Sequence, residues 1–272
     1  RDVAGIITRG GTKIGSARSK RFMDPSFRAI AARNLQTLGI DRLIVLGGDG
    51  SFRGMERFYA ETGISFCGIP STIDNDINGT DSCLRGDTPL GAIKDAIDQI
   101  RDTASSFRRA FVIETMGRNC GYLALISAIT SGAELCLIPE IPTDINEYKG
   151  CFQSQIAKGR DYFIAIVSEA LQNTTEVSQW FEKELGFESR VSILGHIQRG
   201  GNPSVYDRLM AYRFVTYAID ALLEGKTHSV ICYTKSHFAF KTIDEVALHP
   251  YRIDEELLTL GYEQFAPSHC QM

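Results

Sequence analysis

Three aspartates, Asp74, Asp76 and Asp81, lie in the segment PSTIDNDINGTD, directly after the apolar run ISFCGI. Carboxylates this close repel one another unless a cation, a proton or basic side chains compensate their charge. If the chain is extended here, Asp74 and Asp76 share one face, beside the hydroxyl of Thr72. One acid could then act as a general base while the other positions a metal. A solvated cluster of Asx turns is the structural alternative.

A glycine-rich loop, GGDGS (residues 47–51), follows a second apolar run, RLIVL. Glycines allow the backbone to turn sharply and to bring its N–H groups close to a phosphate. Asp49 adds a carboxylate for Mg²⁺, which prefers oxygen ligands together with phosphates. A tight strand-to-helix turn capped by an aspartate has the same pattern, so both interpretations stay open here.

Polar and basic residues follow three more apolar runs. MGRNCGYLA places Gly117 and Arg118 just before a helix, and an arginine at a helix entrance favours an anionic ligand. GHIQRGG places His196 and Arg199 between glycines, which suits a phosphate pocket. Glu169 ends another run, where it could accept a hydrogen bond from a sugar hydroxyl. The alternatives are a surface arginine beside an ordinary helix start for Arg118, a satisfied structural histidine for His196 and a carboxylate in water for Glu169.

The apolar pattern predicts the scaffold that positions these groups. Strand-length apolar runs alternate with segments of helical period, which indicates parallel sheets with helices on both faces. Such folds bind ligands outside the carboxyl ends of the strands, where the polar groups lie. The predicted strands are 42–46, 64–69, 110–115, 134–138, 162–167, 190–194 and 229–233, and the clearest helices span about 25–38, 90–100 and 203–224.

Composition excludes several other classes of protein. A chain of 272 residues, 43% hydrophobic and 23% charged, can bury a sizeable core and form two domains. The net charge of -4 shows no bias toward nucleic acid, and no apolar run approaches the ~20 residues that span a bilayer. The seven cysteines lack CxxC pairing, which predicts reduced, mostly buried thiols in a cytoplasmic protein rather than disulfides or zinc.

The strand ends offer acids for a metal and a proton, glycines for phosphates and arginines for further phosphates. This set of groups fits phosphoryl transfer from a nucleotide to a phosphorylated acceptor. The motifs GGDGS, TIDNDINGTD, MGRNCGYLA and GHIQRGGNPSVYDR resemble those of ATP-dependent 6-phosphofructokinases of the bacterial type, in the same order and at similar spacings. RGGTKIGSAR and IRDTASS also resemble that family, so the resemblance covers nearly the whole chain.

The resemblance implies an α/β fold of two doubly wound, mostly parallel domains with the active site in the cleft between them. A nucleotide-binding domain is expected at 1–85 with 199–250, and a sugar-phosphate-binding domain at 86–198 with 251–272. Family members begin with a strand and a GGDxPG loop that contacts ATP, and this chain starts past that element. It is therefore expected to be incomplete, with exposed sheet edges and, by itself, weak or no kinase activity.

The implied reaction is transfer of the ATP γ-phosphoryl group to the 1-hydroxyl of fructose 6-phosphate, a step of glycolysis, with Mg²⁺ as cofactor. Asp74 matches the catalytic base, Asp49 the Mg²⁺ carboxylate and Asp76 the second carboxylate of the motif. Nucleotide-binding positions match Arg18, Ser19, Gly48, Asp49, Gly50 and Ser51. Positions that hold the sugar phosphate match Thr72, Asp74, Met116, Gly117, Arg118, Glu169, His196 and Arg199, with Thr72 and Arg118 also assisting catalysis.

Arg109 and Arg190 resemble a pair that a neighbouring subunit supplies, which implies a homo-oligomer, usually a tetramer, in which affinity is coupled to quaternary state. The resemblance also implies an effector site for ADP or phosphoenolpyruvate. Its matching positions are Arg101, Glu134, Lys158 and Arg160, the last standing where bacterial members usually have lysine. Neither a nucleic acid nor a membrane is expected as a partner.

The phosphoryl donor is predicted from two positions. Pyrophosphate-using relatives typically carry Asp in place of Gly50 and Lys in place of Ser71. An acidic side chain at Gly50 would repel the α-phosphate of a nucleotide, so the glycine favours ATP. A pyrophosphate-dependent enzyme is the alternative, as is a non-catalytic or incomplete family member acting as a regulatory subunit.

Overall fold

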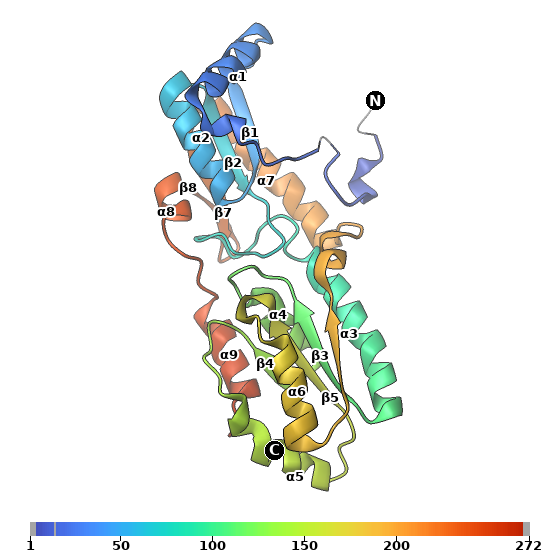
Figure 1. Ribbon diagram of the computed structural model, residues 1–272. Helices are drawn as coiled ribbons and strands as arrows, with labels where there is room; N and C mark the ends of the chain where they lie inside the picture. The colour runs from blue at the N-terminus through green and yellow to red at the C-terminus, as the bar shows by residue number, and fades with distance from the viewer. Residues whose placement is uncertain (1–3, 14, 269–272) are drawn as a thin grey trace. The chain divides into compact units, whose positions relative to one another are not determined.

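The computed structural model describes residues 4–13 and 15–268. The chain divides into two compact units (Figure 1). Unit 1 comprises Arg1–Asp87 and Asn202–Arg252, and unit 2 comprises Thr88–Gly201 and Ile253–Met272. Each unit contains one four-stranded sheet.

Unit 1 is built on the sheet β1-β2-β7-β8. Strands β1, β2 and β7 run parallel, and β8 returns antiparallel to β7. The strands are β1 (Arg42–Gly47), β2 (Ser65–Pro70), β7 (Ser229–Thr234) and β8 (His237–Thr242). The helices are α1 (Pro25–Thr37), α2 (Asp49–Thr62), α7 (Val205–Leu223) and α8 (Ile243–Ala247).

Helices cover both faces of this sheet because its central strands are apolar on both sides. Phe66 and Val230 pack with Phe52 of α2 in one buried cluster. The alternate residues of the same strands, including Cys67, pack with Phe214 of α7 in another. Figure 1 shows α2 and α7 on either side of β2.

Unit 2 is built on the fully parallel sheet β4-β5-β3-β6. Its strands are β3 (Ala110–Thr115), β4 (Leu135–Leu137), β5 (Phe163–Ser168) and β6 (Ser189–Ile193). Its helices are α3 (Thr88–Phe107), α4 (Tyr122–Ser131), α5 (Lys149–Ala157), α6 (Thr174–Leu185) and α9 (Glu255–Phe265). One face of the sheet packs on an aromatic cluster in which Phe152 of α5 and Phe181 of α6 stack with ring centroids 5.9 Å apart.

The predicted α/β class with two mostly parallel sheets is confirmed, and all seven predicted strands are present. Strand β8 was not predicted. The turn that joins it to β7 consists of Lys235 and Ser236, both with positive φ (49° and 67°). That turn geometry usually selects Asn-Gly or Asp-Gly, so the sequence carries no hairpin signal at this point.

Five cysteines, Cys67, Cys83, Cys120, Cys136 and Cys232, are buried and free, as predicted. Cys151 is disulfide-bonded, so the prediction of reduced thiols was wrong at this residue. Within 4–13 and 15–268, no helix is long and apolar enough to cross a bilayer.

Candidate active site

The carboxyl ends of β1 and β2 bring two predicted motifs together in unit 1. The strands pair in parallel with Gly47 opposite Pro70, and the Ser71 N–H donates to the Gly47 carbonyl oxygen at 2.9 Å. The loop with Asp49 and the loop with Asp74 therefore leave the sheet side by side. This placement follows the rule that ligand-binding loops gather at the carboxyl ends of parallel strands.

The GGDGS segment is the start of α2. Gly48 is the N-cap and Asp49 the first helical residue, while Gly50 and Ser51 complete the exposed beginning of the helix. A Cβ atom at Gly47 would lie 2.5 Å from the Ser51 Cβ, so the strand can enter the helix this tightly only with glycine there. The N-cap residue makes no side-chain hydrogen bond to this helix, and the Ser51 N–H donates to the Gly48 carbonyl oxygen at 2.9 Å.

The TIDND segment is held by Asn75, which lies between the two acids. Asn75 is 2% exposed and has a left-handed backbone (φ 51°). Its Nδ2 donates to the Asp81 carbonyl oxygen at 3.0 Å, and its Oδ1 accepts the Cys83 N–H at 2.7 Å. The Asp74 N–H donates to the Thr72 hydroxyl at 3.2 Å. A buried carboxamide thus fixes the backbone between Asp74 and Asp76.

The charges of Asp49 and Asp76 both act on one buried thiol, that of Cys83. Burial raises the pKa of Cys83 well above its ordinary value, and the charges of Asp76 and Asp49 raise that pKa further. The Oδ1 atoms of Asp49 and Asp74 have almost no access to solvent.

These acids fit a magnesium ion that arrives with phosphates better than a resident metal. Within the described ranges, no group of three or more His, Cys, Asp and Glu side chains is arranged to hold a metal. Mg²⁺ in phosphoryl-transfer sites is usually held by one or two carboxylates, with phosphates and water as its other ligands. Asp49 and Asp76, both half-buried, supply that number.

Asp81 and two predicted nucleotide-binding residues of unit 1 have different surroundings. Asp81, the third acid of PSTIDNDINGTD, accepts the Lys235 N–H at 2.7 Å and donates its own N–H to the Tyr233 carbonyl oxygen at 2.8 Å. It therefore anchors the segment to the β7–β8 turn. Ser19 accepts the Phe22 N–H at 3.3 Å, and Arg18 is exposed beside it.

In unit 2 the carboxyl ends of β3, β5 and β6 are neighbours. Thr115 of β3 lies opposite Ser168 of β5, and Glu114 lies opposite Ile193 of β6. The segments that follow these strands carry Met116–Arg118, Glu169 and the 3-10 helix Gly195–Arg199. Three predicted sugar-phosphate segments therefore meet at one end of this sheet.

Glu169, which was predicted to bind the sugar phosphate, forms hydrogen bonds to the backbone of the loop after β3. Its Oε1 accepts the N–H groups of Gly117 at 3.2 Å and Arg118 at 2.7 Å. Gly117 has φ 151°, and a Cβ there would lie 2.2 Å from the Cys120 carbonyl oxygen, so glycine is required. Arg118 has a left-handed backbone (φ 59°) and an exposed side chain. The conformation of the loop thus depends on the positive φ of Gly117 and Arg118 and on the two hydrogen bonds to the Glu169 carboxylate.

A residue that the sequence interpretation missed, Gln198, joins this loop to the Gly195–Arg199 helix. Its Oε1 accepts the Met116 N–H at 3.1 Å, and its Nε2 donates to the Gly195 carbonyl oxygen at 3.1 Å. The side chain is fully buried, while His196 and Arg199 on the same short helix are exposed. A neutral residue between a histidine and an arginine carried no charge signal, so its role became visible only in the structure.

Arg109 and Arg190 are not brought to Arg118 within their own unit. Arg109 precedes β3 and Arg190 is near the start of β6, so both lie at the amino ends of strands whose carboxyl ends carry the other groups. A six-residue strand spans roughly 20 Å. Glu188 binds both arginines, with Arg109 Nε at 2.8 Å, and the hydrogen bond from Arg109 holds the pKa of Glu188 below its ordinary value.

The predicted effector residues also lie toward the amino ends of strands in unit 2. Glu134 precedes β4, forms an ion pair with Arg160 and accepts the Ile164 N–H at 2.7 Å. Arg101 donates to the Ser131 carbonyl oxygen, and Lys158 is exposed at the end of α5. The structure thus pairs Glu134 with Arg160 but gives Arg101 a backbone partner.

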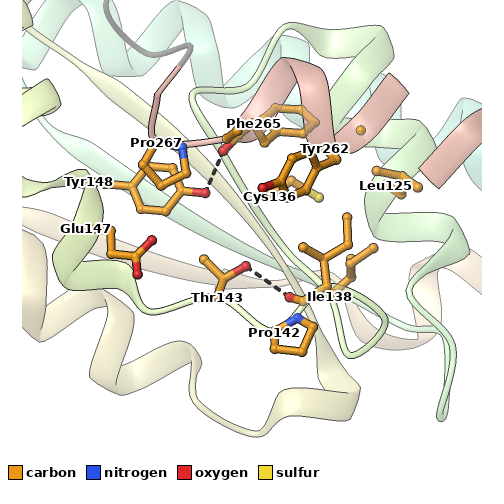
Figure 2. A pocket seen from close by; sticks show the side chains of 13 residues that line it. Leu125, Cys136, Ile138, Pro142, Thr143, Glu147, Tyr148, Tyr262, Phe265 and Pro267 are labelled. Atoms are coloured by element: carbon orange, nitrogen blue, oxygen red, sulfur yellow. Dashed lines mark hydrogen bonds between the residues drawn. The ribbon is translucent and has the colours of Figure 1, made fainter. Parts of the chain in front are cut away.

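A pocket of about 120 Å³ lies elsewhere in unit 2, and Figure 2 shows its lining. It is mostly apolar, with Glu147 as its charged side chain and with Tyr148 hydrogen-bonded to the Phe265 carbonyl oxygen. None of the predicted site residues lines it. The predicted chemistry therefore belongs to the strand ends, not to this pocket.

Comparisons with known proteins agree with the motifs. A family model described as Phosphofructokinase matches residues 1–222. The chain is 63% identical over 259 residues to an ATP-dependent 6-phosphofructokinase from Sulfurimonas denitrificans, covering 95% of this chain and 81% of that protein. It is 61% identical over 272 residues to a protein of the same name from a Sulfurovum species, covering all of this chain and 83% of that protein.

A solved structure is also similar. The phosphofructokinase from Saccharomyces cerevisiae superimposes with a TM-score of 0.83 at 30% identity, covering all of this chain and 40% of the yeast chain. This chain thus spans about two fifths of the yeast chain it resembles. With a family match over most of its residues, a fold of two mostly parallel sheets and the family's motifs at the strand ends, the chain belongs to the phosphofructokinase family.

Proposed function

We propose that this chain provides the catalytic residues of an ATP-dependent 6-phosphofructokinase, which transfers the γ-phosphoryl group of ATP to the 1-hydroxyl of fructose 6-phosphate. The products are fructose 1,6-bisphosphate and ADP. The observation that carries the proposal is that Asp49, and Asp74 with Asp76, lie in loops that follow the adjacent ends of β1 and β2, in a member of this family. The names of two relatives above 60% identity support the choice of reaction.

In the proposed mechanism Asp74 accepts the proton of the attacking hydroxyl, and Thr72 holds Asp74 through the hydrogen bond to its N–H. Asp49 and Asp76 would hold Mg²⁺, which supplies positive charge to the transferring phosphate oxygens. Arg118, exposed at the tip of its loop, neutralises the charge that develops in the transition state. Arg18, Ser19, Gly48, Gly50 and Ser51 are proposed to contact the nucleotide.

The proposed sugar-phosphate side consists of Met116, Gly117, Arg118, Glu169, His196 and Arg199. Arg109 and Arg190 are proposed to serve the site of a neighbouring copy, because they lie at the far end of their sheet from Arg118. That arrangement requires a homo-oligomer, proposed to be a tetramer. Arg101, Glu134, Lys158 and Arg160 are proposed as effector-binding residues. Because ATP and sugar phosphates are charged and do not cross bilayers unaided, the proposed location is the cytoplasm, where they are found.

ATP is proposed as the donor on the basis of Gly50. A Cβ at Gly50 would meet no atom within 4 Å, so an aspartate would fit the fold and act only on the ligand. Gly50→Asp should therefore leave the thermal midpoint unchanged and lower kcat/KM for ATP by at least about tenfold, since two like charges a few ångströms apart repel. An unchanged preference for ATP over pyrophosphate would contradict this account of donor choice.

The activity is tested by coupled assay of ADP release in the natural gene product that contains this chain, with the 272-residue chain assayed in parallel. Asp74→Ser should lower kcat by about 10²–10⁴-fold, the usual effect of removing a general base, and leave fructose 6-phosphate binding intact. Asp81→Ser is the matched control, because Asp81 belongs to the same motif but bonds the Lys235 backbone.

The possible results separate the claims. Absence of turnover by the wild-type gene product with ATP would refute the proposed function. Turnover by the wild type together with near-normal kcat in Asp74→Ser would refute only the assignment of Asp74 as the base. Equal losses in Asp74→Ser and Asp81→Ser would indicate that the motif acts through folding.

A further inference from the structure

Gln198 occupies an unusual position between two segments that are proposed to bind the sugar phosphate. One segment is Met116–Arg118, after β3, and the other is the 3-10 helix Gly195–Arg199, after β6. Gln198 contacts both, accepting the Met116 N–H and donating to the Gly195 carbonyl oxygen, each at 3.1 Å. Its side chain has no solvent access, so water cannot replace either bond.

The chemistry of these two bonds requires a carboxamide. One end of the side chain must accept from a backbone N–H while the other end donates to a backbone carbonyl. A carboxylate accepts at both ends, and an apolar side chain of similar size satisfies neither backbone group. An asparagine is one methylene shorter, so it cannot span the same separation.

The neighbours of Gln198 on the short helix point to solvent. His196 and Arg199 are exposed, whereas Gln198 is buried against the end of β3. Fixing Gln198 therefore fixes the direction in which His196 and Arg199 leave the protein surface. Glu169 holds the same loop at Gly117 and Arg118, so the loop is fastened on two sides.

We propose that Gln198 is a positioning residue, which locks the turn of His196 and Arg199 to the loop of Met116–Arg118 before the sugar phosphate binds. This inference rests on the proposed function and deepens it. Groups held in their binding geometry lose less conformational entropy when the ligand arrives, so preorganisation appears as affinity. The affinity for fructose 6-phosphate should therefore depend on Gln198, and the affinity for ATP should not.

The test compares Gln198→Leu and Gln198→Glu with the wild type in the natural gene product. Gln198→Leu removes both bonds at similar volume, and the KM for fructose 6-phosphate should rise about tenfold or more, while the KM for ATP changes less than about twofold. Tyr148→Phe is the matched control. It removes another buried hydrogen bond to a backbone carbonyl in unit 2, that of Phe265, away from the proposed site.

A purely structural role predicts a different result. Loss of folded protein lowers the measured kcat in proportion and leaves both KM values unchanged. Hydrogen exchange gives a readout that does not need activity: Met116 and its neighbours in the loop should exchange faster in Gln198→Leu and not in Tyr148→Phe.

The glutamate variant adds a test by pH. Burial raises the pKa of the introduced carboxyl, and only its protonated form can both accept from Met116 and donate to Gly195. The ratio of the variant's KM for fructose 6-phosphate to that of the wild type should therefore fall between pH ~8 and pH ~6. The ratio for Gln198→Leu should stay constant.

The outcomes separate this inference from the proposed function. If the wild type phosphorylates fructose 6-phosphate and Gln198→Leu has an unchanged KM for it, the positioning role is wrong and the function stands. If the wild type shows no turnover, the proposed function fails. Faster exchange at Met116 in Gln198→Leu would then still support the structural link between the two segments, and unchanged exchange would overturn it.

Discussion

Asn75 should be the residue whose loss most disturbs the aspartate motif, although it carries no charge. Asn75→Ala removes the hydrogen bond to the Asp81 carbonyl oxygen, worth about 1 kcal/mol, and leaves the N–H of buried Cys83 without its partner, which costs about 1–3 kcal/mol. The left-handed backbone (φ 51°) costs alanine roughly 1 kcal/mol more than asparagine. The expected loss of stability is about 3–5 kcal/mol.

The measurement is urea unfolding together with hydrogen exchange of the amides in 75–84. Asn75→Gly also lacks the two hydrogen bonds, but glycine, unlike alanine, adopts the left-handed backbone without a penalty. Its stability should therefore lie between those of the wild type and Asn75→Ala. Asn78→Ala is the control in the same segment. Its Nδ2 donates to the Glu245 carbonyl oxygen at 2.8 Å in an exposed position, and its loss should cost less than about 1 kcal/mol.

Asn75→Ala should lower kcat as well as stability, because Asn75 lies between Asp74 and Asp76. We expect kcat in the natural gene product to fall at least about tenfold in folded Asn75→Ala, since a small misplacement of a base has large effects on rate. A stability loss no larger than that of Asn78→Ala would refute the role given to the buried carboxamide. Normal kcat with the full stability loss would refute its link to the acids.

Two further predictions concern unit 2 and the buried thiols. Gly117→Ala places a Cβ 2.2 Å from the Cys120 carbonyl oxygen, so thermal unfolding should show a loss of stability of more than about 2 kcal/mol. Gly159 also has positive φ, but a Cβ there meets no atom within 4 Å, so Gly159→Ala should lose only about 1 kcal/mol. Equal losses of stability in the two variants would show that the contact with the Cys120 carbonyl oxygen does not matter. Burial raises the pKa of Cys67 to about 11, so the folded protein holds this proton more tightly than the unfolded chain, and stability should fall as the pH rises from about 9 to about 11. Cys67 should contribute about 2–3 kcal/mol to this fall, so the fall should be smaller by that amount in Cys67→Ala, in which the other buried thiols remain; an equal slope in both proteins would contradict it.

Much of the fold could be predicted because each element carries its own signal. The strands at 110–115 and 162–167 are continuous apolar runs, as buried parallel strands require. Helix α1 begins as predicted, with Pro25 in the first turn and Asp24 accepting the Ser26 N–H at 2.8 Å. The hairpin strand β8 escaped prediction because its turn uses Lys235 and Ser236 where the geometry favours glycine.

The residue types at the strand ends can be identified from the sequence, because a motif such as TIDND or GHIQRGG occupies consecutive positions. Which of these groups come together depends on how the strands pair. The loops that carry Asp49 and Asp74 leave the sheet side by side through the pairing of β1 with β2, while Arg109 lies at the opposite end of its sheet from Arg118.

This difference follows from the distance along the chain over which each interaction acts. Helix caps and apolar periodicity act over a few residues, so they can be read along the chain. The hydrogen bond of Gln198 to Met116 joins residues 82 positions apart, and it exists only because β6 pairs with β3. A neutral, buried carboxamide is recognised by its neighbours in space, and those neighbours are known only once the sheet has formed.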